Sequence, residues 1–490
     1  MALNHYDAII IGAGHNGLVA AAYLARQGKK ILVLERRAIV GGSVVTESFG
    51  DDFTVDSVQT GGSLRPDILR DLQLGRDGMS RPAFISLQPD GNHLTLDAES
   101  IKRFSEKDAA RWDEFVRFMN KAAEILDTAY STIMPRLPKN FSWSEGYGLL
   151  ELGLDLRLAG RKDMLNFIRA LPMTAQELVE EYFESEIVRA AIASVAIHGS
   201  TLGPMSAGTG YTLIHNWMNR GGLSHINVGK AGEITSTLTN AVKSLGGEIR
   251  TEAEVTKICV ENQAARSVML ASGEEIPANT ILSCADPKQT LLKLVGPMEL
   301  PPEFVWHAQS IKMRGSVAKV HLQTDGNHGI PDGTVILARS IKYLERAYDA
   351  AKYGEISEKP YLEVTTSGNV VSIHFQFAPY HLKNSNWNVE GARAESLAID
   401  TLGEYCSNLK SSIKNTKTIT PKDLEETYGL TEGDINHGQL MLDQFLFMRP
   451  IPGWSNHQTP IDHLYLCGSG VHSGGGVSGA AGRNVVKVLT

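Results

Sequence analysis

Short apolar runs separated by an amphipathic stretch open the chain. The isoleucines Ile9 to Ile11 predict a strand buried on both faces, and Ile31–Leu34 predicts a second strand. The alanine-rich segment LVAAAYLARQG between them predicts a helix that ends at Gly28, since glycine commonly follows the last helical residue. This order of strand, helix and strand predicts an α/β fold that begins with a parallel sheet.

Between residues 81 and 219 the apolar positions recur at helical spacing. Stretches such as EKDAARWDEFVRFMNKAAEILDTAY and TAQELVEEYFESEIVRAAIASVAIHG carry charged faces opposite an apolar one. The segment LPKNFSWSEGYG is polar and contains glycine and proline, which indicates a loop. We therefore expect a helical cap in this part of the chain.

Short strands then return. A helix over AGEITSTLTNAVKSLG precedes strands expected around Ile249 and at Val255–Val260, Val268–Leu270 and Thr280–Ser283. Further on, SVAKVHLQT and NVVSIHFQFAPY predict strands, and GARAESLAIDTLGEYC predicts a helix. Because 490 residues exceed what one core usually supports, we expect two interleaved domains. The first comprises residues 1–80, 220–298 and 425–490, and the second, a mixed α+β substrate domain, comprises residues 81–219 and 299–424.

A glycine motif follows the first strand. Gly12, Gly14 and Gly17 match G-x-G-x-x-G, which provides a tight turn, a close approach to a pyrophosphate and close packing of helix on strand. The helix that follows offers free N–H groups to phosphates. Glu35, at the end of the next strand, can accept hydrogen bonds from both hydroxyls of an unphosphorylated ribose. The sequence therefore predicts a dinucleotide site, and the motif alone does not separate NAD from FAD.

A second pair of glycines, Gly41 and Gly42 in VGGSVVTESF, offers another approach of bare backbone to the pyrophosphate. On this pair the sequence resembles the flavoprotein superfamily of amine oxidases and phytoene desaturases. Ser43 stands where the amine-oxidase branch has arginine and where the phytoene-desaturase-related branch tends to have a small residue. FQFAPYHLKNSNW and GDINHGQLMLDQFLFMRPIPGW extend the similarity over nearly the whole chain.

Within this superfamily the chain is most similar to the phytoene-desaturase-like oxidoreductases, in the subgroup that contains pyridine nucleotide-disulfide oxidoreductase domain-containing protein 2. The segment INVGKAGEI, residues 226–234, departs from the GGMG-like turn that is usual there.

The resemblance implies FAD, bound by a Rossmann-type domain of the glutathione-reductase-like kind without a separate NAD domain. No second G-x-G-x-x-G follows a strand, which agrees with this expectation. Val255 matches the position whose backbone meets the adenine, and residues 60–63 match the segment that passes the flavin ring. The residues expected to hold FAD are Gly12, Ala13, Gly14, Asn16, Gly17, Glu35, Arg36, Gly41, Gly42, Ser43, Thr60, Gly61, Gly62, Ser63, Val255, Gly468, Gly476 and Val477.

Near the C-terminus, LYLCGSGVHSGGGVSGAAGRN predicts a strand to Cys467, a glycine loop and a helix from about Ser478. If FAD is bound, this helix would stabilise a reduced, anionic flavin by roughly 0.3–2 kcal/mol. Five of the nine residues 468–476 are glycine, and we expect Gly474, Gly475 and Gly476 to let the backbone lie against the ring.

No catalytic acid-base pair is visible, and hydride transfer from a C–H bond to flavin N5 does not require one. His472, inside the glycine loop, and His437, in DINHG, are the candidates for proton transfer, with a structural histidine as the more frequent alternative. The same alternative applies to His198. Arg65 is either a contact of the flavin or a substrate anion, or a surface residue.

The net charge and the length of the apolar runs restrict which binding partners are expected. The formal net charge of -8 argues against nucleic acid and acidic lipid, which normally bind basic surfaces. No run is long enough for a signal-peptide core or for the roughly 18–20 residues of a membrane-spanning helix. We expect a cytoplasmic protein, with peripheral membrane contact if the substrate is lipid-like. The sequence does not predict an oligomeric state.

The four cysteines, Cys259, Cys284, Cys406 and Cys467, lie far apart with no C-x-x-C pair. This spacing predicts reduced core thiols, no redox-active dithiol and no metal site.

The leading hypothesis is therefore an FAD-dependent dehydrogenase or desaturase of a largely apolar small molecule that passes electrons to oxygen, a quinone or another acceptor. A redox-neutral carotenoid-type isomerase and an amine oxidase use related sites, although the arginine expected of an amine oxidase after Gly42 is missing. A partner-binding scaffold that keeps FAD without turnover is the alternative outside enzymes.

Overall fold

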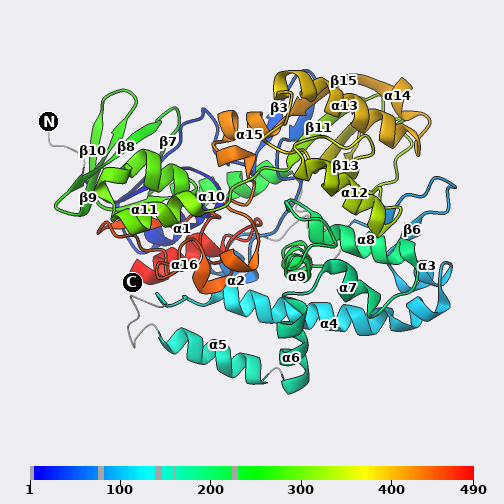
Figure 1. The fold of residues 1–490 in the computed structure, drawn as a ribbon. Helices are drawn as coiled ribbons and strands as arrows, with labels where there is room; N and C mark the ends of the chain where they lie inside the picture. Colours follow the sequence, from blue (N-terminus) through cyan, green and yellow to red (C-terminus); the bar gives the residue numbers. More distant parts are fainter. Residues whose placement is uncertain (1–4, 76–81, 138–145, 159, 223–229, 490) are drawn as a thin grey trace.

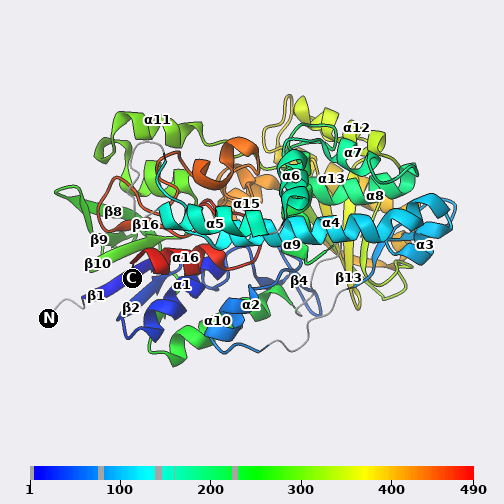
Figure 2. The same ribbon diagram turned by 90° about the horizontal axis from the view of Figure 1, so that it is seen from below.

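Two seven-stranded sheets organise the molecule. The computed structural model describes residues 5–75, 82–137, 146–158, 160–222 and 230–489. Figure 1 shows the first sheet on the left and the second at the upper right, and the long helix α4 (Glu106–Ser131) runs beneath α8 and α9. Figure 2, from below, shows α4 extending across the half that holds the second sheet.

The first sheet is built from three distant stretches of chain. Its core is parallel, and β10 also pairs antiparallel with β9, which pairs antiparallel with β8. The predicted α/β character is therefore confirmed. The parallel strands are, in spatial order, β7 (Glu248–Arg250), β2 (Ile31–Leu34), β1 (Tyr6–Ile11), β10 (Glu275–Ser283) and β16 (Leu464–Leu466), and the antiparallel strands are β9 (Ala264–Leu270) and β8 (Val255–Glu261).

Three helices form an apolar core with one face of this sheet: α1 (His15–Arg26), α10 (Ala231–Ser244) and α16 (Ala480–Leu489). The small buried side chains of α1 allow this close packing, and the chain leaves the helix through Gly28 at φ +77°. The opposite face packs against η2 (Gln289–Val295) and α11 (Pro302–Ser310). The glycine turn between β1 and α1 is thereby fixed at the carboxyl edge of the sheet.

The second sheet has one apolar and one polar face. The apolar face packs against α13 (Trp387–Gly403), while the polar face is turned away from it. Strands β11 and β14 and helix α13 were predicted, but β12, β13 and β15 were not. In spatial order the strands are β15 (Ile413–Ile419), β11 (Val317–Thr324), β14 (Val370–Gln376), β13 (Tyr361–Ser367), β12 (Thr334–Ile336), β5 (Phe84–Ser86) and β6 (Leu94–Thr95).

The expected helical cap is present, but it does not begin at residue 81. Strands β5 and β6 come first and complete the second sheet, because β5 pairs with β12 and β6 pairs with β5 instead of continuing the helical pattern. The helices that follow are α3 (Ala98–Lys102), α4, α5 (Gly146–Leu158), α6 (Arg161–Ala170), α7 (Ala175–Glu180), α8 (Glu186–Ile197) and α9 (Thr209–Arg220).

Two sequence interpretations lie partly outside the described residues. Residues 138–145 of the predicted loop and residues 226–229 of the divergent segment INVGKAGEI belong to this group. Among the described helices, none combines the length and the apolar character needed to cross a bilayer. Among the described residues, the remaining strands and α-helices are the hairpin of β3 (Thr46–Ser48) and β4 (Thr54–Asp56) and the helices α2 (Pro66–Asp71), α12 (Ile341–Lys352), α14 (Leu409–Ser412) and α15 (Pro421–Tyr428).

Candidate functional site

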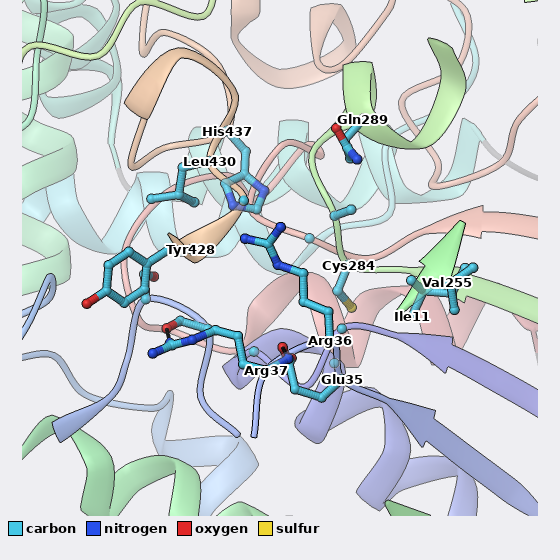
Figure 3. Close-up of a pocket in the computed structure, with 18 of the residues that line it drawn as sticks. Ile11, Glu35, Arg36, Arg37, Val255, Cys284, Gln289, Tyr428, Leu430 and His437 are labelled. Carbon is cyan, nitrogen blue, oxygen red and sulfur yellow. Dashed lines mark hydrogen bonds between the residues drawn. The ribbon is translucent and has the colours of Figure 1, made fainter. Parts of the chain in front are cut away.

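A cavity lies at the carboxyl edge of the first sheet (Figure 3). Parallel strands place the turns that follow them along one edge, which is where ligands bind in open α/β sheets. The cavity is lined by the turns after β1, β2, β10 and β16, by the start of β8, by η2 and by the end of α15 with the residues that follow it. Of the predicted site residues, Gly12, Gly14, Asn16, Gly17, Glu35, Arg36, Gly41, Gly42, Ser43, Val255, His437 and Gly468 are in this lining.

Each of the three motif glycines is favoured at its position for a different structural reason. Gly12 adopts φ +94°, a conformation that favours glycine. A side chain at Gly17 would overlap the carbonyl oxygen of Gly12. Gly14 has no atom within 4 Å of where its Cβ would lie, so this part of the backbone faces open space. The turn thus exposes backbone at the positive end of α1, which is suited to an anion such as a pyrophosphate.

Glu35 is held in place by the backbone. Its carboxylate oxygens accept hydrogen bonds from the N–H of Ala13 at 2.9 Å and of Arg37 at 3.0 Å, and the residue is only 5% exposed. Each oxygen has a further lone pair, so the fixed carboxylate still has capacity for two ribose hydroxyls.

The end of α15 closes one side of the cavity. Arg36 donates to the carbonyls of Glu426 at 3.1 Å and Thr427 at 2.7 Å. Arg37 forms an ion pair with Glu47. Figure 3 shows Arg36, Arg37 and Tyr428 along this side of the cavity. Arg36 therefore joins the turn after β2 to a helix about 390 residues later in the chain, a contact that no local pattern indicates.

The buried His15 and the partly buried His437 face the cavity, each with an unsatisfied ring nitrogen. His15 Nε2 and His437 Nδ1 have no hydrogen-bond partner, and the same holds for Asn16 Oδ1. Burial, and then the proximity of His437, lower the pKa of His15 to about 4. Burial also lowers the pKa of His437, partly offset by Asp286. His15 was not among the site residues predicted from the sequence, although it lies inside the glycine motif. Buried polar atoms of this kind usually have partners, so these atoms fit a polar or anionic ligand in the cavity.

The residues predicted to lie near the flavin are in two segments outside the cavity lining. Thr60, Gly61, Gly62 and Ser63 form one segment, and Gly476 and Val477 belong to the other. The segments pack together, because a Cβ at Gly62 would lie 2.5 Å from that of Val477. Their contact with a flavin remains a prediction.

The C-terminal glycine loop has close protein neighbours. A side chain at Gly474 would overlap Arg449, a Cβ at Gly475 would lie 2.9 Å from His215 Nε2, and one at Gly476 would lie 2.5 Å from Asn219 Oδ1. The bare backbone therefore accommodates α9 and Arg449 in this structure, which differs from the expected contact with a ring. The helix also begins later than expected, at Ala480.

Arg449 fastens this loop to the segment that carries His437. It is 1% exposed and donates to the carbonyls of Val471 at 3.1 Å, Ser469 at 3.0 Å and Asn436 at 2.7 Å. No local sequence pattern predicts this role of Arg449. A buried guanidinium that donates to several backbone carbonyls is costly to replace, because its loss leaves those carbonyls without partners.

His472 lies away from the cavity lining. Its Nε2 donates to the carbonyl of Ala129 in α4 at 2.9 Å, and burial lowers its pKa to about 4. This environment is that of a neutral, hydrogen-bonded imidazole, and a role in proton transfer stays a prediction. Arg65 is partly buried and pairs with Asp127 and with Asp67, and its contact with a flavin or a substrate anion stays a prediction.

The expectation of four free cysteines is wrong. Cys284 and Cys467 form a disulfide, while Cys259 and Cys406 are free. The two bonded residues follow β10 and β16, which are neighbours in the sheet. Because 183 residues separate the two cysteines in the sequence, their spacing gave no indication of a disulfide.

The chain matches the family model described as flavin containing amine oxidoreductase over residues 17–383. It is 31% identical over 550 residues to pyridine nucleotide-disulfide oxidoreductase domain-containing protein 2 from Mus musculus, covering 99% of this chain and 93% of that protein. It is 26% identical over 510 residues to a lycopene-forming phytoene desaturase from Pantoea ananas, covering 96% of each chain. The predicted resemblance is confirmed.

The fold is similar to that of a putrescine oxidase variant, with a TM-score of 0.60 and 14% identity over 99% of both chains.

Proposed function

Since the chain belongs to the flavin-containing amine oxidoreductase family and is an FAD-dependent oxidoreductase, we propose that it is a dehydrogenase or desaturase of a largely apolar organic substrate. When bound, FAD supplies the chemistry by accepting a hydride from a substrate C–H bond and passing the electrons to oxygen, a quinone or another acceptor. The residues of the chain bind the cofactor, align the substrate and exclude water.

The cavity and the arrangement of strands around it support this proposal. In a Rossmann-type domain, the strand that precedes the glycine turn lies at the centre of a parallel sheet, as β1 does between β2 and β10. The N–H groups at the start of α1 and the turn at Gly41 and Gly42 would hold the pyrophosphate. Glu35 would bind the adenosine ribose, and the backbone near Val255 would meet the adenine.

The flavin would extend from Gly468 toward residues 60–63 and 476–477. This path would bring the flavin ring toward the second sheet, which belongs to the predicted substrate domain. The single observation that carries the proposal is the convergence of the open turn at Gly14, the fixed carboxylate of Glu35 and the unsatisfied nitrogens of His15 and His437 on one cavity.

An anaerobic substrate screen tests the proposed reaction. FAD-loaded protein is mixed without oxygen with unsaturated hydrocarbons, saturated lipids and primary amines, and the visible flavin absorption is recorded. We expect bleaching by an apolar compound and recovery of colour when an acceptor is admitted. Bleaching by amines alone would favour an amine oxidase, and substrate rearrangement with no net change of flavin would favour an isomerase.

A further inference from the structure

The disulfide between Cys284 and Cys467 lies beside the glycine turn of the cofactor cavity. Cys284 is partly buried and lines the cavity (Figure 3), whereas Cys467 is fully buried. The two residues follow β10 and β16, which are neighbouring parallel strands, and the N–H of Cys467 donates to the carbonyl of Ser283 at 2.9 Å. The bond therefore ties together two of the turns that form the cavity.

The glycine turn after β1 packs directly on Cys284. A Cβ at Gly17 would lie 3.0 Å from Cys284 Sγ, and one at Gly12 would lie 3.6 Å from Cys284 Cβ. The N–H of Cys284 donates to the carbonyl of Ile11, the last residue of β1, at 2.8 Å. The position of Cys284 thus helps to set the position of the backbone N–H groups that are available to a pyrophosphate.

The turn after β16, on the other side of the bond, forms a second part of the lining. Gly468, next to Cys467, lines the cavity, and a Cβ at Gly468 would lie 2.5 Å from the carbonyl oxygen of Cys284. The hydroxyl of Ser469 accepts a hydrogen bond at 3.3 Å from Asn16 Nδ2, in the first turn of α1. The turn after β16 therefore contacts both the turn after β10 and the helix that is expected to hold the phosphates.

Breaking the bond would change this arrangement, because two unbonded sulfur atoms must lie farther apart than a bonded pair. Cys467 is 0% exposed and belongs to the apolar core around α1, so its sulfur has little room to move. Cys284 borders the cavity, and its sulfur can move toward the space that a pyrophosphate would occupy. Reduction would therefore loosen both turns and bring a thiol toward the phosphates.

We propose that the bond between Cys284 and Cys467 is a thiol–disulfide exchange site that controls the affinity of the chain for FAD. The inference rests on the proposed function, since it takes this cavity as the place of the FAD pyrophosphate. The oxidised protein holds the two turns in the arrangement that binds the cofactor. The reduced protein binds FAD more weakly because this preorganisation is lost. The reagent that acts on the bond is a dithiol.

The exchange takes place in two steps. A thiolate of the dithiol attacks Cys284 Sγ, which borders the cavity, and the bond to Cys467 breaks, so that Cys467 leaves as a thiolate and takes up a proton. The second thiolate of the reagent then attacks the reagent's sulfur in the mixed disulfide, and Cys284 leaves and is protonated. The dithiol loses two electrons and two protons and becomes a disulfide, while the protein gains two thiols.

The effect must be reciprocal. If reduction weakens FAD binding by a given factor, FAD makes the bond harder to reduce by the same factor. A pyrophosphate in the cavity would also cover the approach to Cys284, which slows the attack by the dithiol.

Titration with FAD before and after reduction tests the exchange site. Cofactor-free protein is divided into an untreated sample and a sample that is reduced with dithiothreitol and transferred to anaerobic buffer without it. Flavin fluorescence then gives the dissociation constant of each sample. We expect binding to be at least about tenfold weaker after reduction, and saturating FAD to slow the release of thiols by dithiothreitol by a similar factor.

A matched pair of serine variants assigns the effect to this bond. Cys467→Ser removes the disulfide and should bind FAD with the affinity of the reduced protein, whether or not it has been treated with dithiothreitol. The control Cys259→Ser removes a free thiol and should keep the difference between the oxidised and the reduced protein.

Equal FAD affinity of the oxidised and reduced proteins, or thiol release that FAD does not slow, would overturn the proposal. Circular dichroism reports whether each sample is folded. If the reduced protein or Cys467→Ser does not fold, the protection of the bond by FAD in the oxidised protein decides. Oxidised protein that binds FAD without any such protection would contradict the exchange site alone, whereas oxidised protein that cannot bind FAD would contradict the proposed function.

Discussion

His15 and His437 lie close together at one cavity although 422 positions separate them, and neither His15 Nε2 nor His437 Nδ1 has a hydrogen-bond partner. His15 begins α1, and His437 belongs to the segment that Arg449 fastens to the C-terminal glycine loop. The first and last parts of the chain therefore place two neutral imidazoles where the phosphates of a dinucleotide are expected.

Binding of FAD should take up protons through this pair. The pKa of His15 is lowered to about 4 without the cofactor, and a nearby pyrophosphate favours the charged imidazole and raises it. We therefore expect FAD to bind more tightly as the pH falls from about 7 to about 6. Calorimetry in buffers of different ionisation enthalpy measures the protons taken up.

The variants His15→Gln and His437→Gln should each reduce this uptake, and His463→Gln at an exposed position is the control. Cofactor affinity that is independent of pH, with no proton uptake, would show that the imidazoles do not face the phosphates.

Two glycine substitutions should separate cofactor binding from folding. Gly14→Ala meets no neighbouring atom within 4 Å at an ordinary φ of -69°, so the protein should fold normally. The added methyl group would occupy the place of the pyrophosphate and weaken FAD binding by about tenfold or more. Gly17→Ala overlaps the Gly12 carbonyl and should lower the free energy of unfolding by about 1–3 kcal/mol.

Thermal unfolding without FAD and a titration with FAD distinguish the two effects. If Gly14→Ala binds FAD as the unchanged protein does, the pyrophosphate does not approach this turn.

The disulfide between Cys284 and Cys467 should be detectable by thiol counting. Denatured but unreduced protein should show two free thiols, those of Cys259 and Cys406, rather than four. Cys467→Ser should lower the free energy of unfolding by about 2–5 kcal/mol, because the bond closes a long loop. Four reactive thiols in protein purified without reductant would contradict this bond.

Acid should destabilise the cofactor-free protein well above the range in which carboxylates titrate. Burial lowers the pKa of His321 to about 3 and that of His457 to about 4, from an ordinary 6.5. Below pH 6.5 the unfolded chain binds protons that the folded chain does not, so stability present at neutral pH is lost as the pH falls toward these values. The total loss should be on the order of several kcal/mol.

Urea unfolding of the cofactor-free protein at several pH values measures this slope, and His321→Gln should reduce it. A midpoint that stays constant or rises between about pH 6.5 and pH 5 would be inconsistent with neutral buried imidazoles.

Local patterns were sufficient to predict the first strand, the glycine turn, α1 and the acidic end of β2, because each depends on residues close in sequence. They also located β8 to β10, β11, β14 and α13. Local patterns could not predict the side of the cavity that α15 forms. Arg36 contacts this helix through backbone carbonyls, and the helix lies far from Arg36 in the sequence. The juxtaposition of Lys319, His374 and Glu363 on neighbouring strands was equally hidden, because it depends on the register between β11, β14 and β13.

The glycines near the C-terminus show the opposite limitation. Their density correctly indicated a need for bare backbone, but sequence could not identify the neighbour. In the structure His215, Asn219 and Arg449 occupy positions beside Gly474 to Gly476.

The most direct test of the central claim is a spectrophotometric titration of cofactor-free protein with FAD. The account predicts saturation at about one FAD per chain, with a perturbed flavin spectrum, and loss of this binding in Glu35→Ala, whose carboxylate would otherwise bind the ribose. Failure of the folded, unchanged protein to bind FAD, or binding that Glu35→Ala and Gly14→Ala leave intact, would contradict it.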